Sequence, residues 1–264
     1  MNFIDKIIRW GLAFIGGCVV SYCVLVLAVV ATAPDLRLRF LLVDLDSTTP
    51  SAKLSGIEFQ QVPSDFKCKG RPPQKGDRLI MMDQMAVTNF LDFSRIQLSL
   101  RTRDFYSLVP DMDPLTDGLP PLVQDSDGVR WLKIEYTTPD SSAPITCAVQ
   151  LQTVSARDVG LTLVWFLLQL LIFSVGAVAF WNRPFDDSAR RFFAMSISTL
   201  GAFVGGFHWT TVAGSFWLTI PFAVSGILLP AVTLHFFMVY PRPKPPISHW
   251  PRIVTCLVYA IPAV

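Results

Sequence analysis

Charged side chains are scarce in this sequence of 264 residues. Lysine, arginine, aspartate and glutamate together make up 16% of the chain, and apolar residues make up 52%. A soluble domain usually carries about 25% charged residues. The shortage of charge therefore disfavours an ordinary soluble enzyme and predicts an integral membrane protein.

Motifs for catalysis, metal binding and nucleotide binding are also missing. The sequence has no HExxH zinc motif, no CxxC pair and no GxxxxGK[ST] phosphate loop. Residues 223–226 (Ala-Val-Ser-Gly) are similar to a serine-protease turn, but serine and glycine are common packing residues in membrane helices. Basic residues are dispersed without interleaved aromatics, which disfavours a nucleic-acid partner. No cofactor, metal site or catalytic residue is predicted within residues 1–264, and enzyme activity of a longer protein stays open.

Long stretches without charge predict helices that cross a lipid bilayer, for which about 20 apolar residues suffice. The first such stretch runs from Trp10 to Pro34. Its basic start and the small residues at 31–33 leave a cleaved signal peptide as an alternative. The apolar run is longer than the ~7–15-residue core of a signal peptide. We therefore expect residues 1–34 to hold a cytoplasmic N-terminus and an uncleaved first span.

The C-terminal part, residues 159–264, predicts further spans. The apolar stretch at its end would extend only about 18 Å as a helix, too short for a crossing. We therefore expect this last span to be truncated, in a chain that is a fragment of a longer protein. The expected helices are about 159–181, 192–211, 216–240 and, truncated, 253–264.

The distribution of charge predicts an orientation. The short segments 1–9, 182–191 and 242–252 together hold eight basic and three acidic residues, whereas 35–158 holds 14 basic and 17 acidic residues. Short loops rich in lysine and arginine stay in the cytoplasm. We expect four complete crossings of the cell (inner) membrane, with the N-terminus cytoplasmic and residues 35–158 extracytoplasmic.

Residues 75–100 have the pattern of turn, strand, turn and helix. A Gly-Asp dipeptide precedes a short apolar run at 78–82, and Asp83-Gln84 forms a second turn. Apolar residues then recur at helical spacing from Phe90 to Leu100, and Asn89 can cap that helix. Further strands are expected at Phe40–Val43, Gly56–Val62, Trp131–Tyr136 and Ile145–Leu151.

Two other features of the central region are predicted from composition and alternation. Residues 104–128 are rich in proline and aspartate, so we expect an inserted loop without regular structure that packs on the rest of the region. The strand at 145–151 alternates, which places Ile145, Cys147, Val149 and Leu151 on one face.

This order of elements resembles the core of a bacterial PDZ domain, in which a Gly-Asp-x-Ile/Leu strand and an Asp-Gly-x-Pro-Val hairpin precede the groove helix. Gln84 and Ala86 stand where that family usually has glycine and proline, and the resemblance covers roughly residues 54–152. It implies a mixed α/β domain at 35–158 that binds a peptide or a protein C-terminus. The candidate groove residues are Gly56, Ile57, Glu58, Phe59, Phe90 and Phe93; an ordinary strand without a ligand is the alternative.

Cysteine and histidine residues supply the other candidates. Cys68 and Cys147 can form a disulfide if their segment lies in an oxidising compartment. His208 and His235 are the ionisable side chains within the later apolar runs, where such residues are functional candidates. Hydrogen bonding to a neighbouring helix is the simpler explanation for both histidines.

The ending Leu-His-Phe-Phe-Met-Val-Tyr-Pro at 234–241, together with the order of parts, resembles the sensor region of bacterial multi-span signalling proteins. Among these proteins, it especially resembles histidine kinases of the competence-pheromone type. It implies a membrane-bound input region that binds an extracellular peptide and signals to a cytoplasmic output domain beyond Val264. A homodimer is compatible with this organisation. The alternatives are a PDZ-bearing regulator or adaptor of envelope proteolysis, and a transport or structural membrane protein.

Overall fold

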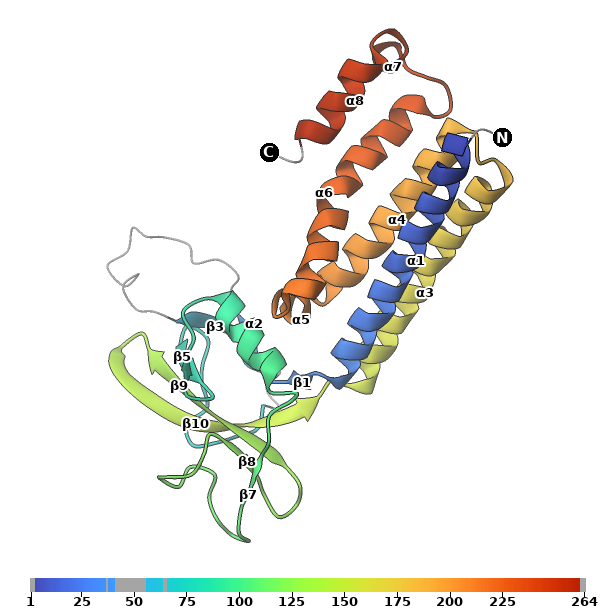
Figure 1. The fold of residues 1–264 in the computed structure, drawn as a ribbon. Helices are drawn as coiled ribbons and strands as arrows, with labels where there is room; N and C mark the ends of the chain where they lie inside the picture. Colours follow the sequence, from blue (N-terminus) through green and yellow to red (C-terminus); the bar gives the residue numbers. More distant parts are fainter. Residues whose placement is uncertain (1–2, 37, 41–55, 64–65, 262–264) are drawn as a thin grey trace. The chain divides into compact units, whose positions relative to one another are not determined.

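The computed structural model describes residues 3–36, 38–40, 56–63 and 66–261 (Figure 1). The chain divides into two compact units. A helical unit comprises Met1–Val30 and Ser155–Val264, and an α/β unit comprises Ala31–Val154. The α/β unit is thus inserted in the sequence between the first and second long apolar helices.

Among the described residues, three helices of the helical unit are long and apolar enough to cross a membrane: α1 over Arg9–Thr32, α3 and α6. The chain is therefore a membrane α-helical protein with a mixed α/β unit, as predicted. Helix α4 has 21 residues but is not one of these three helices, so its crossing remains a prediction. The helices are α1 (Phe3–Thr32), α3 (Ala156–Asn182), α4 (Asp187–Phe207), α5 (Trp209–Ala213), α6 (Phe216–Val239), α7 (Pro245–His249) and α8 (Pro251–Ala260).

The outer surface of these helices suits hydrocarbon. On α3, Leu171 and Val178 are 65% and 60% exposed, while Phe166 and Phe180 are buried among the helices. A soluble protein rarely exposes such a continuous apolar surface. Contact with a lipid bilayer accounts for it, because lipid tails are as apolar as leucine.

Small residues let the helices of this unit approach closely, above all Gly201 and Gly205 of α4. A Cβ added at Gly201 of α4 would collide with the side chain of Ser225 on α6. A Cβ at Gly205 would lie 2.5 Å from the ring of Phe222 and 2.9 Å from the hydroxyl of Tyr22. Close backbone approach of this kind replaces the hydrophobic driving force that is absent in lipid.

We expect Gly201→Ala to weaken the α4–α6 contact. The added methyl must displace Ser225, and such overpacking costs about 1–3 kcal/mol of unfolding free energy. Gly226→Ala is the matched control, because no heavy atom lies within 4 Å of its added Cβ and alanine is the better helix former. SDS titration of the detergent-solubilised chain measures both. Equal stability of the two variants would contradict the proposed close approach.

The α/β unit is built on a sheet in the order β1-β10-β9-β5-β3-β2. Figure 1 shows β9 and β10 as its long, curved central hairpin. Strands β3, β5, β9 and β10 confirm four of the predicted strands, whereas the predicted strand at 40–43 lies mostly outside the described residues. The elements are β1 (Pro34–Asp35), β2 (Arg39–Phe40), β3 (Ile57–Gln61), β4 (Cys68–Lys69), β5 (Arg78–Met82), β6 (Met85–Ala86), α2 (Phe90–Ser99), β7 (Tyr106–Ser107), β8 (Leu122–Gln124), β9 (Arg130–Thr138) and β10 (Ser141–Thr153).

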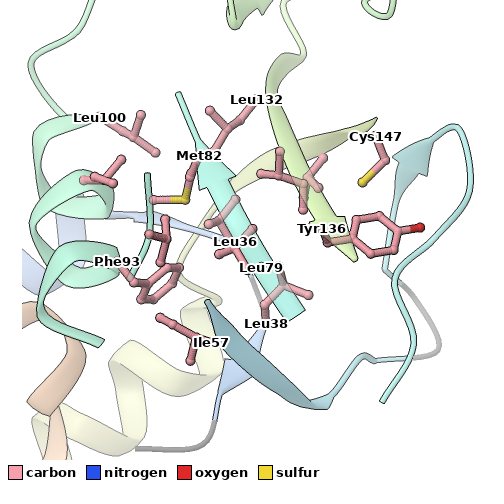
Figure 2. Packing of buried hydrophobic residues seen from close by; sticks show 14 of the residues in the cluster. Leu36, Leu38, Ile57, Leu79, Met82, Phe93, Leu100, Leu132, Tyr136 and Cys147 are labelled. Atoms are coloured by element: carbon pink, nitrogen blue, oxygen red, sulfur yellow. The ribbon is translucent and has the colours of Figure 1, made fainter. Parts of the chain in front are cut away.

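The main core of the α/β unit lies between α2 and one face of the sheet (Figure 2). Phe93 of α2 and Leu100, the residue that caps its C-terminus, pack in the same cluster as Leu79 and Met82 of β5. The alternation predicted in β10 is confirmed, since its core face contributes Ile145, Cys147, Val149 and Leu151 to this cluster.

Residues 104–128 differ from the expectation of a loop without regular structure. Strand β7 pairs in parallel with β8, and β8 pairs antiparallel with β9. Leu108 and Val123 of this segment pack with Trp131 and Ala148 in a second cluster. The segment therefore covers the opposite face of the β9–β10 hairpin, which confirms that it packs on the sheet. The pairing of β8 with β9 satisfies backbone hydrogen-bonding groups of this segment. The proline- and aspartate-rich composition of the segment did not predict that pairing.

A tight turn at Asp83-Gln84 joins β5 to β6. Both residues have positive φ, 53° and 59°, and Met82 pairs with Met85. This is the backbone of a two-residue type I′ hairpin, in which asparagine and glycine are preferred. Asp83 is buried, its carboxylate lies 3.7 Å from the guanidinium of Arg103, and burial raises the pKa of that carboxyl against the opposing effect of Arg103.

We expect Asp83→Asn to stabilise this hairpin at neutral pH. A carboxyl whose folded pKa is raised contributes stability below its unfolded pKa, and that stability is lost as pH rises through the folded pKa. Asparagine carries no charge and tolerates positive φ. The advantage of the variant should therefore grow from pH 4 to pH 7. Hydrogen exchange of residues 78–87 in the full chain measures it; a pH-independent difference would contradict the role of the buried charge.

Candidate functional site

Of the predicted groove residues at 56–59, Gly56 precedes β3 and the other three begin it, but two of their side chains face the core. Ile57 and Phe59 are 5% and 0% exposed, and the Phe59 ring packs edge-on against Tyr136. These two side chains therefore do not line a groove, contrary to the expectation that they form its wall. Any ligand at this strand would contact its backbone and the half-buried Glu58.

Gly56 is required by the local backbone. Its φ is +132°, and a Cβ would lie 2.6 Å from the carbonyl oxygen of Leu79 in the neighbouring strand. A side chain there would meet both backbone strain and a collision. The glycine before β3 thus has a structural role, whatever its role in ligand binding.

The edge of β3 is the part of the sheet where an added strand could pair. One side of β3 pairs with β5 through Ile57 and Glu58, and the amide of Phe59 donates to Asp77 O at 2.9 Å. On the other side, the pairing with β2 covers Phe59 and Gln61. Among the described strands, none pairs with Gly56–Glu58 on this side. An extended peptide can bind such an edge by β-strand addition.

Helix α2 begins at the predicted cap. Oδ1 of Asn89 accepts a hydrogen bond from the amide of Asp92 at 2.9 Å, and the Asp92 carboxylate accepts from the amide and hydroxyl of Thr88. The first bond satisfies one exposed amide of the first turn, and the others hold Thr88, the residue before the cap, against Asp92. Phe93 is buried in the core, whereas Phe90 is partly buried beside it, with ring centroids 6.2 Å apart. Of the two predicted groove phenylalanines, Phe90 is thus the more accessible.

A hydrogen bond connects α2 to the strand that follows α1 in the chain. Nε2 of Gln97 donates to the carbonyl oxygen of Pro34 at 3.1 Å. Pro34 and Asp35 form β1, which pairs antiparallel with Thr153 and Gln152 at the end of β10. The segments by which the chain enters and leaves the α/β unit are therefore joined to each other and to α2. The sequence contains no local signal for this contact, because its partners are 63 positions apart.

The two cysteines of the α/β unit are free thiols on paired strands. Cys68 of β4 pairs with Val149 of β10, so Cys147 is its diagonal neighbour. Diagonal positions have Cα atoms about 7–8 Å apart, beyond the usual span of a disulfide. Burial raises the pKa of Cys147 to about 12, with Cys68 adding to the effect, and burial also raises the pKa of Cys68. Both thiols are therefore weak nucleophiles at neutral pH, and a bond between them stays a prediction that requires β4 to shift.

His235 belongs to a polar chain through three helices. Nε of Arg191 on α4 donates to Nε2 of His235 on α6 at 3.0 Å, and Nδ1 of His235 lies 3.1 Å from the hydroxyl of Tyr259 on α8. Because Nε2 accepts, a neutral imidazole carries its proton on Nδ1 and donates it to Tyr259. Arg191 also lies 3.3 Å from Asp187 in an ion pair. His235 thus forms hydrogen bonds with two neighbouring helices, which is the simpler of the two explanations given for it above.

His208 has a similar role between α3 and the end of α4. Its Nε2 lies 3.0 Å from the hydroxyl of Thr162 on α3, and that hydroxyl donates to Asp158 O at 2.8 Å. Nε2 of His208 is therefore the donor in the contact with Thr162. Among the residues that the structure describes, no cluster of three or more histidine, cysteine or acidic side chains could hold a metal ion.

No protein family, no characterised protein and no solved structure matches this chain. Its function must therefore be argued from the arrangement of its own residues, because a fold by itself does not identify an activity.

We expect Gln97→Ala to loosen the β1–β10 pair without weakening α2. Alanine is the best helix former, so the helix itself should remain. Loss of one hydrogen bond should speed amide exchange at residues 35–36 and 152–153 by about twofold to tenfold. Gln60→Ala on the exposed part of β3 is the matched control. Hydrogen exchange of the full chain in nanodiscs measures both variants, and equal rates would show that the Gln97–Pro34 bond does not stabilise the pair.

Proposed function

We propose that this chain is the input region of a membrane receptor, in which the α/β unit binds the C-terminus of an extracellular peptide or protein. The observation that carries the proposal is the joining of α2 to the β1–β10 pair through Gln97 and Pro34. Pro34 follows the end of α1 at Thr32, and Thr153 precedes the start of α3 at Ala156. A shift of α2 on ligand binding would thus act directly on the segments that continue into two membrane helices.

The proposed binding site is the edge of β3 at Gly56–Glu58 together with the first turn of α2. A peptide pairing there would take main-chain hydrogen bonds from the strand, and its terminal carboxylate would bind backbone amides near Gly56, as the resemblance to PDZ domains implies. Among the strands that the structure describes, none pairs with Gly56–Glu58 on this side, and this edge and the partly exposed Phe90 support the placement. Because β2 covers Phe59 and Gln61, the site suits a short C-terminal segment.

In this proposal the membrane part has four crossings, α1, α3, α4 and α6, with the α/β unit outside and the N-terminus in the cytoplasm. The 21 residues of α4 extend about 31 Å, enough for the hydrocarbon layer. Basic residues near 1–9, 182–191 and 242–252 support the orientation. The cell (inner) membrane, a homodimer and a downstream kinase-type output domain belong to the same proposal.

The polar chain from Arg191 through His235 to Tyr259 supports transmission within the membrane. It joins α4, α6 and α8 by hydrogen bonds. Because hydrogen bonds are directional, these bonds form in only a few relative positions of the three helices. A displacement of α3 that moved α4 would therefore favour one set of partners over another. Two-state rearrangements of packed helices are a common means of signalling.

The proposal is tested with peptides that end in a free carboxylate behind an apolar residue, titrated onto the full chain in nanodiscs. We expect saturable binding by biolayer interferometry, weakened about tenfold or more when the same peptide is amidated, because a charge-assisted hydrogen bond is lost. Gly56→Ala should abolish binding. Gly118→Ala is the control, since Gly118 also has positive φ, +81°, but lies in residues 104–128 with open space around it. Equal binding of acid and amide peptides, or none of either, would refute the proposal.

A further inference from the structure

A pocket of about 710 Å³ lies within the helical unit, where the end of α3, the start of α4 and the end of α6 meet. Figure 1 shows these three helix ends in the same region of the unit. Binding sites for small molecules usually have volumes of about 300–1,000 Å³, so the pocket is large enough for a ligand. Because α3 and α6 are candidate spans, their ends mark a boundary between hydrocarbon and water.

The lining of this pocket changes from polar to apolar along each of the three helices. Residues with charged or hydroxyl groups lie just beyond the helix ends, and apolar residues lie four to six positions deeper, which corresponds to about 6–9 Å. The outer residues are Arg183, Asp186 and Tyr240, and the deeper ones are Ala179, Phe192 and Phe236. At a membrane boundary this gradient suits an amphiphile whose apolar part extends toward the hydrocarbon.

Three aromatic residues, Phe192, Phe236 and Tyr240, form one side of the pocket, which we call the aromatic wall. The rings of Phe192 and Phe236 have centroids 5.6 Å apart, and those of Phe236 and Tyr240 are stacked at 5.3 Å. Tyr240 is 52% exposed, whereas both phenylalanines are half-buried. The wall therefore offers aromatic faces for an alkyl chain and ends in a tyrosine, which suits a position between an apolar region and water.

The outer part of the pocket carries one positive and one negative side chain. Arg183 and Asp186 belong to one tight turn, because the amide of Asp186 donates to Arg183 O at 3.1 Å. Both side chains are exposed, and among the described residues none forms an ion pair with the guanidinium of Arg183. Hydrogen bonds from the amides of Ala189 and Ser188 lower the pKa of the Asp186 carboxyl, and the nearby Arg183 adds to the effect. The carboxylate is therefore ionised at neutral pH and retains lone pairs for a further donor.

This pair of charges selects the ligand that fits the outer part. A simple anion is attracted by Arg183 and repelled by Asp186, and a simple cation meets the opposite pattern. A headgroup that contains both a phosphate and an ammonium group pairs with both side chains. A soluble zwitterion would leave the aromatic wall uncovered, whereas a phospholipid also supplies the alkyl chains that cover it.

We propose that this pocket binds a zwitterionic phospholipid from the bilayer. Its phosphate bonds to the guanidinium of Arg183, its ammonium group pairs with Asp186, and its acyl chains pack on the aromatic wall. The bound lipid thereby holds the end of α6 to the turn between α3 and α4. The site lies entirely within the helical unit, so it does not depend on peptide binding by the α/β unit. Sequence analysis missed it because α6 lies far from residues 179–192 in the chain.

The proposal is tested by native mass spectrometry of the full chain in detergent, titrated with phosphatidylethanolamine or phosphatidylglycerol of the same acyl chains. We expect saturable binding, about threefold to fivefold tighter for phosphatidylethanolamine, because phosphatidylglycerol lacks the ammonium group. Glycerophosphoethanolamine, which has no acyl chains, should not compete even in large excess. A diazirine near the start of an acyl chain should label residues 179–192 and 236–240. Equal or tighter binding of phosphatidylglycerol, competition by the soluble headgroup, or labelling confined to other residues would overturn the proposal.

Substitutions at the two charges separate their roles. Asp186→Asn should abolish the preference for phosphatidylethanolamine but leave the start of α4 intact, because asparagine and aspartate are comparable helix caps. Arg183→Gln should weaken the binding of both lipids by about threefold to fivefold. Arg157→Gln is the matched control, since Arg157 is an exposed arginine at the other end of α3. An unchanged preference in Asp186→Asn, or an equal loss of binding in Arg157→Gln and Arg183→Gln, would contradict the proposed site.

Discussion

The organisation of this protein depends on one short antiparallel pair, Pro34–Asp35 with Gln152–Thr153. The chain passes from a long apolar helix into the sheet through the first strand of that pair and returns through the second. Backbone hydrogen bonds hold the two connections in register, and the bond from Gln97 to Pro34 adds helix α2 to them. In the proposed receptor, a shift of α2 would act on the two segments that continue along the chain into α1 and α3.

The helical unit obeys a different constraint, the absence of water in hydrocarbon. Its helices satisfy their own backbone groups, so contacts between them rely on close approach and on a few polar bonds. Gly201 and Gly205 permit the close approach. The polar bonds run from Arg191 through His235 to Tyr259. Gln169 departs from this rule, because its buried amide oxygen has no partner among the described residues.

Local patterns predicted much of the fold and little of the site. The strands at 57–61 and 78–82, the cap at Asn89 and the buried face of β10 follow from alternation and turn chemistry within a few residues. The short strands β7 and β8 did not, because pairing with β9 overrides the composition of a proline-rich segment. Ile57 and Phe59 were expected in a groove and lie in the core, since alternation identifies a buried face but not what buries it.

The sequence by itself determined that this is a membrane protein with a polar region inserted after its first long apolar helix, because burial in lipid and helical length are properties of consecutive residues. It also determined which residues cap α2 and which face of β10 is apolar. Only the tertiary structure decided that α2 bonds to β1, that His235 lies between Arg191 and Tyr259, and that Oε1 of Gln169 is buried without a partner among the described residues. Those contacts join residues far apart in the chain, and their partners are set by how whole elements pack.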